Sequence, residues 1–409
     1  MIYAVTNAMV GVVPVALLPL LTREFTPDEY GIVAMYTVFV QMMGLLVGLS
    51  VHGAVGVRYF DREELDYPRF VGTCLIILLA SSSVTFILVL LAGPFLERVI
   101  DIPAPWMLVA VAASACAFLT QIRLAIWQSS KHPVPFAAMR IFQAGVDISL
   151  SLIFVIVMKM AWQGRTGGMA IALFFTGMAS LISLWRGGWI TFKFDPGYAR
   201  SALRFGVPLI PHAVGGFLVA TVDRFLITNI LDVAKTGIYM VAVQVGMIVL
   251  MGVDAVARAV SPWLIESLKA NDARKDILVV RLTYVYFIAV LGGGFLLGII
   301  APPVLAAIVG PQYQEAAPIV IYLAIGQAIG GLYLIMSNYI FFTGRTAQLA
   351  VISVLSGVLN TALSYVLLKA IGLQGAAVAF IAGQTMLFLG TWRLAARARP
   401  MPWLKALAI

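Results

Sequence analysis

The sequence contains apolar runs as long as a membrane-spanning helix, and this feature limits its fold more than any other. The run from Thr73 to Ala92 carries no charged residue. A helix needs roughly 20 apolar residues to cross a bilayer, whereas a membrane β-strand needs about ten residues of alternating polarity. Since backbone groups in lipid must be hydrogen-bonded internally, such runs predict a bundle of transmembrane helices.

Composition supports this prediction and excludes other classes of protein. Of the 409 residues, 62% are hydrophobic and 11% are charged, whereas soluble domains average about 45–50% and about 25%. A chain of soluble domains, a disordered chain and a disulfide scaffold are therefore excluded. The net charge of +9 is not concentrated in a basic domain, so we expect no nucleic-acid partner.

No pattern indicates catalysis, a metal or a cofactor. The sequence has no G-x-x-x-x-G-K-[ST] phosphate loop, no H-E-x-x-H and no G-x-S-x-G. Its histidines, His52, His132 and His212, show no metal-binding spacing. We expect no catalytic residue, no metal and no cofactor, and the protein is not predicted to be an enzyme.

Charged or Pro/Gly-rich breaks divide the chain into about twelve predicted helices, which makes the expected fold an all-α polytopic membrane protein. The longest polar connection is expected over residues 261–281. The predicted spans are residues 2–21, 31–53, 71–92, 106–128, 137–158, 168–188, 205–230, 236–260, 282–302, 316–341, 348–368 and 375–394.

Lys and Arg residues are distributed unequally over the two sides of this arrangement. One side, which includes the C-terminal tail, contains most of the 27 basic residues. The positive-inside rule therefore predicts that both termini are cytoplasmic. No cleaved signal peptide is expected, because no basic segment precedes the first apolar helix. The other side has only Arg23, Arg98, Lys159, Arg165, Lys235 and Lys369.

Two halves of six spans each show weak internal similarity. Because six is even, both halves enter the membrane from the same side, and we expect two six-helix bundles related by a pseudo-two-fold axis along the membrane normal. The matched segments are Gly168–Ala172 with Gly375–Ala379, Trp185-Arg186 with Trp392-Arg393, Gly31-Ile32 with Gly237-Ile238, and the stretches near Asp147 and Asn360.

The predicted domain organisation follows from this repeat. Residues 1–190 form an amino-terminal six-helix bundle, residues 191–204 a cytoplasmic linker, residues 205–394 a carboxy-terminal six-helix bundle, and residues 395–409 a cytoplasmic tail. Two parallel bundles with a cavity between them suit alternating access. Prolines in the first span of each half, Pro14 with Pro19 and Pro208 with Pro211, are expected to bend or break those helices, unless they are merely tolerated membrane prolines.

Charges at membrane depth are costly and mark candidate functional residues. Arg224 in the seventh span either faces an anionic group in a cavity or belongs to a structural ion pair. Arginines near the predicted inner mouth either snorkel to headgroups or form a cationic vestibule that would bind phosphate. The candidate substrate-binding residues are Arg224, Arg258, Arg123, Arg140, Arg58 and Arg281.

Three acids in the same spans are candidates for binding a coupling ion. They are Asp147, Asp223 and Asp254. Asp254 lies four residues before Arg258, in the order that favours a structural pair on one helix face. For Asp147, which has no cation nearby in the sequence, a structural hydrogen-bonding role is the alternative.

Several segments resemble the polysaccharide and O-antigen flippases. Residues Arg23–Gly31 (REFTPDEYG), followed by Met35–Val38 (MYTV), are similar to the first-loop signature of that family, roughly R-x-L-x-x-x-x-Y-G. The start of the second half of the family resembles residues Phe205–Pro211 (FGVPLIP), Asp223-Arg224 and Gly237–Tyr239 (GIY). The segment from Ala301-Pro-Pro to Gly310 and Tyr313 is similar to the connection between its ninth and tenth helices.

The resemblance implies a member of the multidrug/oligosaccharidyl-lipid/polysaccharide exporter superfamily with a V-shaped bundle of twelve helices. It implies movement of a polyprenyl-diphosphate-linked oligosaccharide from the inner to the outer leaflet of a bacterial cell membrane. The implied partners are this lipid, membrane lipids, and a polysaccharide polymerase with chain-length proteins. The family has a cationic cavity, and the resemblance implies that the corresponding residues here are Arg224, Arg258, Arg123, Arg140 and Arg58. The chain departs from the family in lacking a basic segment before its first helix.

Three other functions compete with a flippase. A drug or cation antiporter of the same superfamily would need a cavity rich in acids and aromatic residues, whereas the embedded candidates here are mainly arginines. A membrane glycosyltransferase or polymerase would need a sizeable extramembrane loop with acidic residues, and no predicted loop exceeds about 20 residues. The third alternative, a non-transporting scaffold, is compatible with the same sequence.

Overall fold

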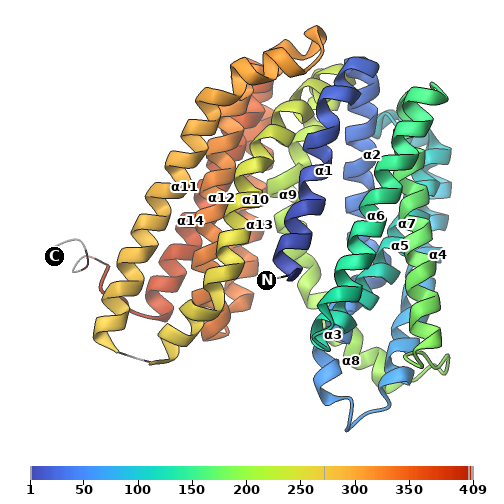
Figure 1. The fold of residues 1–409 in the computed structure, drawn as a ribbon, viewed down its shortest axis with the longest axis vertical. Helices are drawn as coiled ribbons and strands as arrows, with labels where there is room; N and C mark the ends of the chain where they lie inside the picture. Colours follow the sequence, from blue (N-terminus) through green and yellow to red (C-terminus); the bar gives the residue numbers. More distant parts are fainter. Residues whose placement is uncertain (1, 271, 404–405, 407–409) are drawn as a thin grey trace. The chain divides into compact units, whose positions relative to one another are not determined.

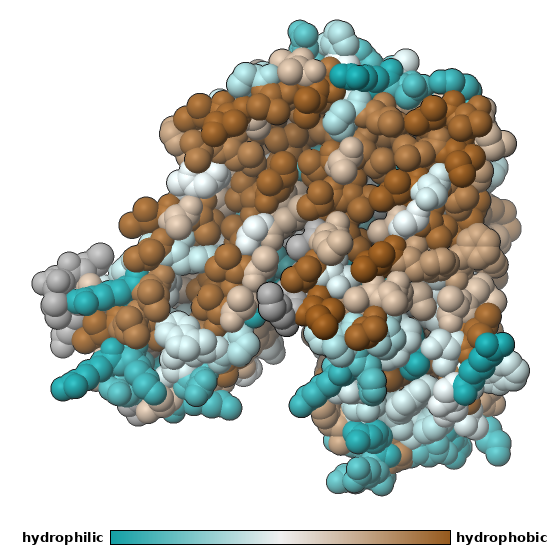
Figure 2. All heavy atoms as spheres, in the orientation of Figure 1, coloured by the Kyte–Doolittle hydropathy of each residue, from teal (hydrophilic) through white to brown (hydrophobic). Residues whose placement is uncertain are grey.

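The chain is folded into α-helices in the computed structural model, which describes residues 2–270, 272–403 and 406 (Figure 1). Twelve segments within these residues are long and apolar enough to cross a membrane, so the predicted all-α polytopic fold is confirmed. On the face drawn in Figure 2, apolar side chains cover the middle of the helices and hydrophilic ones gather toward their ends. Of the expected tail, residues 395–398 belong to the last helix, and residues 404, 405 and 407–409 lie outside the described part.

Two compact units make up the fold. The N-unit is Glu24–Val214, and the C-unit is Tyr3–Arg23 together with Gly215–Ile409. In the N-unit, α5 packs against α2, α3, α4 and α7, and α6 packs against α7. Its helices are α2 (Pro27–Leu46), α3 (Val51–Arg58), α4 (Tyr67–Ile100), α5 (Ala104–Ser129), α6 (Pro133–Leu152), α7 (Ala161–Arg186) and α8 (Pro196–Gly206).

The C-unit is arranged around α12. This helix packs against α10, α11 and α14, and α13 packs against α14. Its interior is apolar and includes a cluster around Val280, Met336 and Tyr339. The helices are α1 (Ile2–Glu24), α9 (Ile210–Ile230), α10 (Val233–Ala270), α11 (Ala273–Ile308), α12 (Ala317–Thr343), α13 (Thr346–Ile371) and α14 (Leu373–Ala398).

Helix α1 is grouped with the C-unit, whereas the sequence analysis assigns it to an amino-terminal bundle of residues 1–190. Its last turn is bound by the segment that precedes α12. The Thr22 hydroxyl accepts a hydrogen bond from the Gly310 amide at 3.4 Å, and the Thr22 carbonyl accepts one from Gln312 Nε2 at 3.0 Å. Such contacts join residues almost 300 positions apart, so adjacency in the sequence could not predict them.

Helix breaks differ from the predicted ones at three places. The second span is interrupted after α2, because Gly48, Leu49 and Ser50 have positive φ angles that no α-helix contains. The expected polar connection over residues 261–281 is largely helical, since α10 reaches Ala270 and α11 starts at Ala273. Pro14 and Pro19 lie inside the continuous helix α1, so the break expected there is absent.

The break expected in the seventh span is present. Helix α8 ends at Gly206, a short 3₁₀ turn covers Val207–Leu209 around Pro208, and α9 starts at Ile210. The expected linker, residues 191–204, thus contains most of the α8 helix. A proline removes a helical donor and clashes with the preceding turn, which is the physical reason for the interruption.

The first glycines of the matched repeat segments have the same structural role in both units. A Cβ atom on Gly168 of α7 would lie 2.7 Å from Ser151 Oγ on α6. One on Gly375 of α14 would lie 2.2 Å from the Leu367 carbonyl oxygen on α13. Each glycine therefore lets the last helix of its half approach the preceding helix closely, which is how small residues act in membrane helix packing.

Gly168→Ala and Gly375→Ala are each expected to lower the free energy of unfolding by about 1–3 kcal/mol, the usual cost of overpacking. The measurement is thermal unfolding of the purified protein in detergent. Gly252→Ala on α10 is the matched control, because nothing lies within 4 Å of its added methyl group and alanine is the better helix former. Equal midpoints for Gly375→Ala and Gly252→Ala would contradict the assigned contact.

Candidate functional site

Arg123 on α5 is a buried arginine inside a membrane-spanning segment of the N-unit. Its side chain is held by α7 and by its own helix: Nε donates a hydrogen bond to Ser183 Oγ at 3.0 Å, and the guanidinium lies 4.3 Å from the Trp127 ring centre. The residue is only 8% exposed, and its Nη1 is buried without a hydrogen-bond partner. No acidic side chain of the described part forms an ion pair with it.

The missing counter-charge is what makes Arg123 chemically informative. A buried charge is expensive unless it is paired and hydrogen-bonded, and breaking a buried pair typically costs about 3–5 kcal/mol. The serine hydroxyl and the indole ring are neutral partners and leave the positive charge in place. An anionic group that reached Nη1 would bind strongly, since arginine presents a planar fork to phosphate or carboxylate oxygens.

Arg140 on α6 and Arg281 on α11 are two further embedded arginines without an ion pair among the described residues. Arg140 is half-buried, and its Nε is buried without a hydrogen-bond partner. Arg281 is half-buried in the C-unit. The predicted arginines therefore divide equally: Arg123, Arg140 and Arg281 are not neutralised, whereas Arg224, Arg258 and Arg58 each have an acidic partner.

Arg224 on α9 is neutralised by its sequence neighbour. Nη1 of Arg224 lies 3.0 Å from Asp223 Oδ1 and also donates to the Ala220 carbonyl, because the side chain folds back along its own helix. Asp223 is 1% exposed, and its Oδ2 accepts a hydrogen bond of 2.7 Å from the Tyr239 hydroxyl on α10. The cluster is compact and electrically neutral, so the structure favours the structural-pair interpretation of both residues.

Asp147 on α6 is paired with Arg165 on α7, a partner that the sequence analysis missed. The two carboxylate oxygens accept hydrogen bonds from Nη1 at 2.5 Å and from Nη2 at 3.3 Å, and Ser151 Oγ accepts another from Nη1 at 2.9 Å. The side chains are 18% and 11% exposed. The spacing of the two residues was compatible with this pair, since residues 18 apart can meet in an antiparallel helix hairpin. The sequence does not say, however, which face of α7 Arg165 occupies.

Asp254 and Arg258 form the expected pair one turn apart on α10, with Oδ2 and Nε 2.6 Å apart. Their side chains are 38% and 54% exposed. Each of the three acids considered for a coupling ion is thus hydrogen-bonded to an arginine. Within the described residues, no group of three His, Cys, Asp or Glu side chains could hold a metal ion.

Arg58 ends α3 and reaches toward α8. Its Nη1 lies 2.9 Å from Asp61 Oδ2, and its Nη2 donates a hydrogen bond to Ser201 Oγ at 3.2 Å. The side chain borders a hollow of about 520 Å³ that Arg200 and Arg204 also line. These two arginines are among the basic residues of the side predicted to be cytoplasmic, and their spacing of four residues places them on one helix face.

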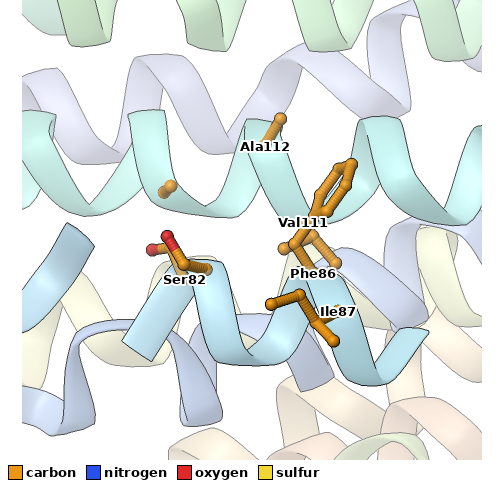
Figure 3. Close-up of a pocket in the computed structure, with 7 residues that line it drawn as sticks. Ser82, Phe86, Ile87, Val111 and Ala112 are labelled. Atoms are coloured by element: carbon orange, nitrogen blue, oxygen red, sulfur yellow. The ribbon is translucent and has the colours of Figure 1, made fainter. Parts of the chain in front are cut away.

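A second hollow of the N-unit, about 290 Å³, lies between α4 and α5 (Figure 3). Ser82, Phe86 and Ile87 line it from α4, and Val111 and Ala112 face them from α5 (Figure 3). No charged side chain lines it, so it offers no positive charge to an anion.

Comparison with known proteins adds family and fold to this geometry. A family model described as "Polysaccharide biosynthesis protein" matches residues 20–318. "Lsg locus putative protein 1" of Haemophilus influenzae is 23% identical over 374 residues, which cover 88% of each chain. A Vibrio cholerae MATE transporter, VcmN in its bent form, has a TM-score of 0.62 at 13% identity and 97% coverage of this chain and 96% of its own. An inward-facing multidrug resistance MATE transporter of the MOP superfamily has a TM-score of 0.64 at 16% identity. The match covers 96% of this chain and 93% of that transporter.

Proposed function

The chain belongs to the polysaccharide biosynthesis protein family, and from this premise we propose that it is a flippase for a polyprenyl-diphosphate-linked oligosaccharide. The structural neighbours support a membrane transporter, because this chain shares its fold with MATE transporters over almost its whole length. A diphosphate cannot cross hydrocarbon unaided, so a protein that moves it must replace its hydration with fixed positive charge. The oligosaccharide would move from the cytoplasmic to the outer leaflet by alternating access.

The observation that carries this proposal is the imbalance of charge at membrane depth. The embedded acids Asp147, Asp223 and Asp254 each have an arginine partner, whereas Arg123 and Arg140 have no acidic one among the described residues. The surplus is therefore positive and favours an anionic substrate. In this proposal Arg123 contacts the diphosphate directly, and Arg140 of the same unit strengthens the positive potential of the N-unit.

A drug or cation antiporter is the second candidate, because the solved structures of the same fold include multidrug resistance transporters. A cation carrier needs an unpaired acid to bind its ion or drug. The pairing of Asp147 with Arg165 and of Asp223 with Arg224 removes the best placed acids from that role. The flippase is therefore the better supported of the two functions.

A flippase of this kind would have a defined cellular location and defined partners. The protein would lie in the inner membrane of a bacterium with both termini in the cytoplasm, which the distribution of Lys and Arg supports. In this proposal a polymerase and chain-length proteins would act on the oligosaccharide after its delivery to the outer leaflet. Products such as O-antigen or exopolysaccharide are consistent with the family description.

A transport assay in vesicles separates these functions. We expect reconstituted protein to expose a polyprenyl-diphosphate-linked oligosaccharide to a lectin on the opposite leaflet, at least tenfold faster than in protein-free vesicles. The matched control substrate is the same glycolipid without its diphosphate, which we expect to move no faster than in protein-free vesicles. Gradient-driven uptake of a cationic dye, with no lipid transfer, would instead establish the antiporter.

A further inference from the structure

Helix α8 has one face packed on the N-unit and one face exposed. Its buried residues are Ala199, Ala202 and Gly206, and the helix packs against α3 and α4. Arg200 and Arg204 are exposed one turn apart on the other side. A helix with one buried face and one exposed face of this kind lies on the surface of its unit and presents its basic residues outward.

The position of α8 is set by contacts at its first turn. Asp195 Oδ1 accepts hydrogen bonds from the amides of Gly197 at 2.8 Å and Tyr198 at 3.1 Å, which caps the helix. The other oxygen of Asp195 lies 3.0 Å from Arg69 Nη2 on α4. The Tyr198 hydroxyl accepts a hydrogen bond from the Asp66 amide at 3.1 Å. The exposed arginines are therefore carried by a helix that is fixed to the N-unit.

One side of the arginine row borders a positively charged hollow. Arg58, Arg200 and Arg204 line it together with Ser201, and its volume is about 520 Å³. Arg58 is partly neutralised by Asp61 at 2.9 Å. Arg200 and Arg204 form no ion pair with any described residue, so the hollow keeps an excess of positive charge.

The other side of the same row borders an apolar hollow of about 650 Å³. Its lining includes Phe194, Leu203, Val207 and Pro208 besides the two arginines. Phe194 and Val207 are 51% and 45% exposed, so about half of each apolar side chain is left uncovered by the described residues. Phe192 and Leu209, two residues from Phe194 and Val207 in the sequence, are also exposed.

We propose that this surface, made of Arg58, Arg200, Arg204, Phe194 and Val207, binds one anionic phospholipid. The phosphate would bind Arg200 and Arg204, with Arg58 at the rim, and an acyl chain would cover Phe194 and Val207. The cationic hollow and the apolar hollow adjoin, because Arg200 and Arg204 line both. A phospholipid has the same arrangement, with an anionic headgroup next to apolar acyl chains. The site lies just before Gly215, where the chain passes from one unit to the other. It does not depend on the transported substrate.

The test is native mass spectrometry of the full-length protein in detergent, titrated with phosphatidylglycerol and phosphatidylethanolamine of equal chain length. Each basic residue near an anionic headgroup contributes about fivefold in affinity, so two arginines predict a preference of roughly 25-fold for phosphatidylglycerol. The double variant Arg200→Gln/Arg204→Gln is expected to reduce this preference to less than about threefold. Arg200→Lys/Arg204→Lys should keep most of it, which shows that the helix is intact.

A matched control removes the same charge elsewhere. Arg274→Gln/Lys275→Gln changes two exposed basic residues at the start of α11, on the side that is also predicted to be cytoplasmic, and should leave the preference unchanged. Equal loss of preference in this control would overturn the proposal in favour of a general charge effect. An unchanged preference in Arg200→Gln/Arg204→Gln would overturn it directly. Displacement of phosphatidylglycerol by millimolar inorganic phosphate would identify a free-phosphate site instead.

Discussion

Arg123→Met is expected to abolish translocation of a polyprenyl-diphosphate-linked oligosaccharide while making the protein more resistant to thermal unfolding. The transport rate should fall at least about 30-fold, because losing one partner of a buried charge contact costs about 2–5 kcal/mol. Stability should rise, because methionine has a similar volume and needs no hydration, whereas the buried Nη1 of Arg123 has no hydrogen-bond partner. The measurements are lectin accessibility in vesicles and the thermal unfolding midpoint in detergent.

Slower transport together with a higher unfolding midpoint in Arg123→Met would identify Arg123 as a substrate-binding residue rather than a structural one. Arg258→Met is the control, since Arg258 is 54% exposed and already paired with Asp254, and it should change transport by less than about threefold. Wild-type transport by Arg123→Met would remove Arg123 from the substrate path. A lower midpoint would show instead that its contacts with Ser183 and Trp127 outweigh the cost of burying its charge.

Asp147→Asn is expected to have the largest effect on stability, a loss of about 3–5 kcal/mol in the free energy of unfolding. Replacing the carboxylate leaves Arg165 without its partner while its side chain is only 11% exposed. The double variant Asp147→Asn/Arg165→Gln should recover most of this loss, because it removes both charges together. Thermal unfolding of the two single variants and the double variant completes the cycle.

The same double variant tests whether Asp147 binds a coupling ion. If the pair is structural, Asp147→Asn/Arg165→Gln should transport within about threefold of wild type and keep the wild-type dependence on pH and sodium. Restored stability with lost transport would show that Asp147 takes part in coupling. Failure of the double variant to regain stability would mean that the hydrogen bonds to Ser151, rather than the charges, hold α6 and α7 together.

The charges embedded in the spans illustrate how far a sequence can locate a site. Positions along the helices were predictable, since runs without charge define the spans and the few charges within them are conspicuous. The partners of those charges were not predictable, because they come from other helices or from an unexpected rotamer. Arg165 reaches Asp147 from the next helix, and Arg224 turns back onto Asp223 although neighbours on a helix point in different directions.

The helix pattern shows the same division between local and distant causes. Pro208 interrupts the seventh span as expected, because proline acts within its own turn. The break at residues 47–50 has no proline, and Leu49 and Ser50 adopt positive φ angles that local preference does not favour. There the Gly48 amide donates a 2.8 Å hydrogen bond to Ser81 Oγ on α4, so a contact outside the segment stabilises the break.

Hydrophobicity and charge along the chain are enough to predict a bundle of membrane-spanning helices, the approximate positions of its spans and the charges embedded in them. These features follow from hydrophobicity and from the need to satisfy backbone hydrogen bonds in lipid, and both act over one helix at a time. The grouping of α1 with the C-unit, and the burial of Arg123 with no acidic partner among the described residues, are visible only in the folded protein. Burial and charge pairing depend on side chains brought together from distant helices, so no local pattern in the chain encodes them.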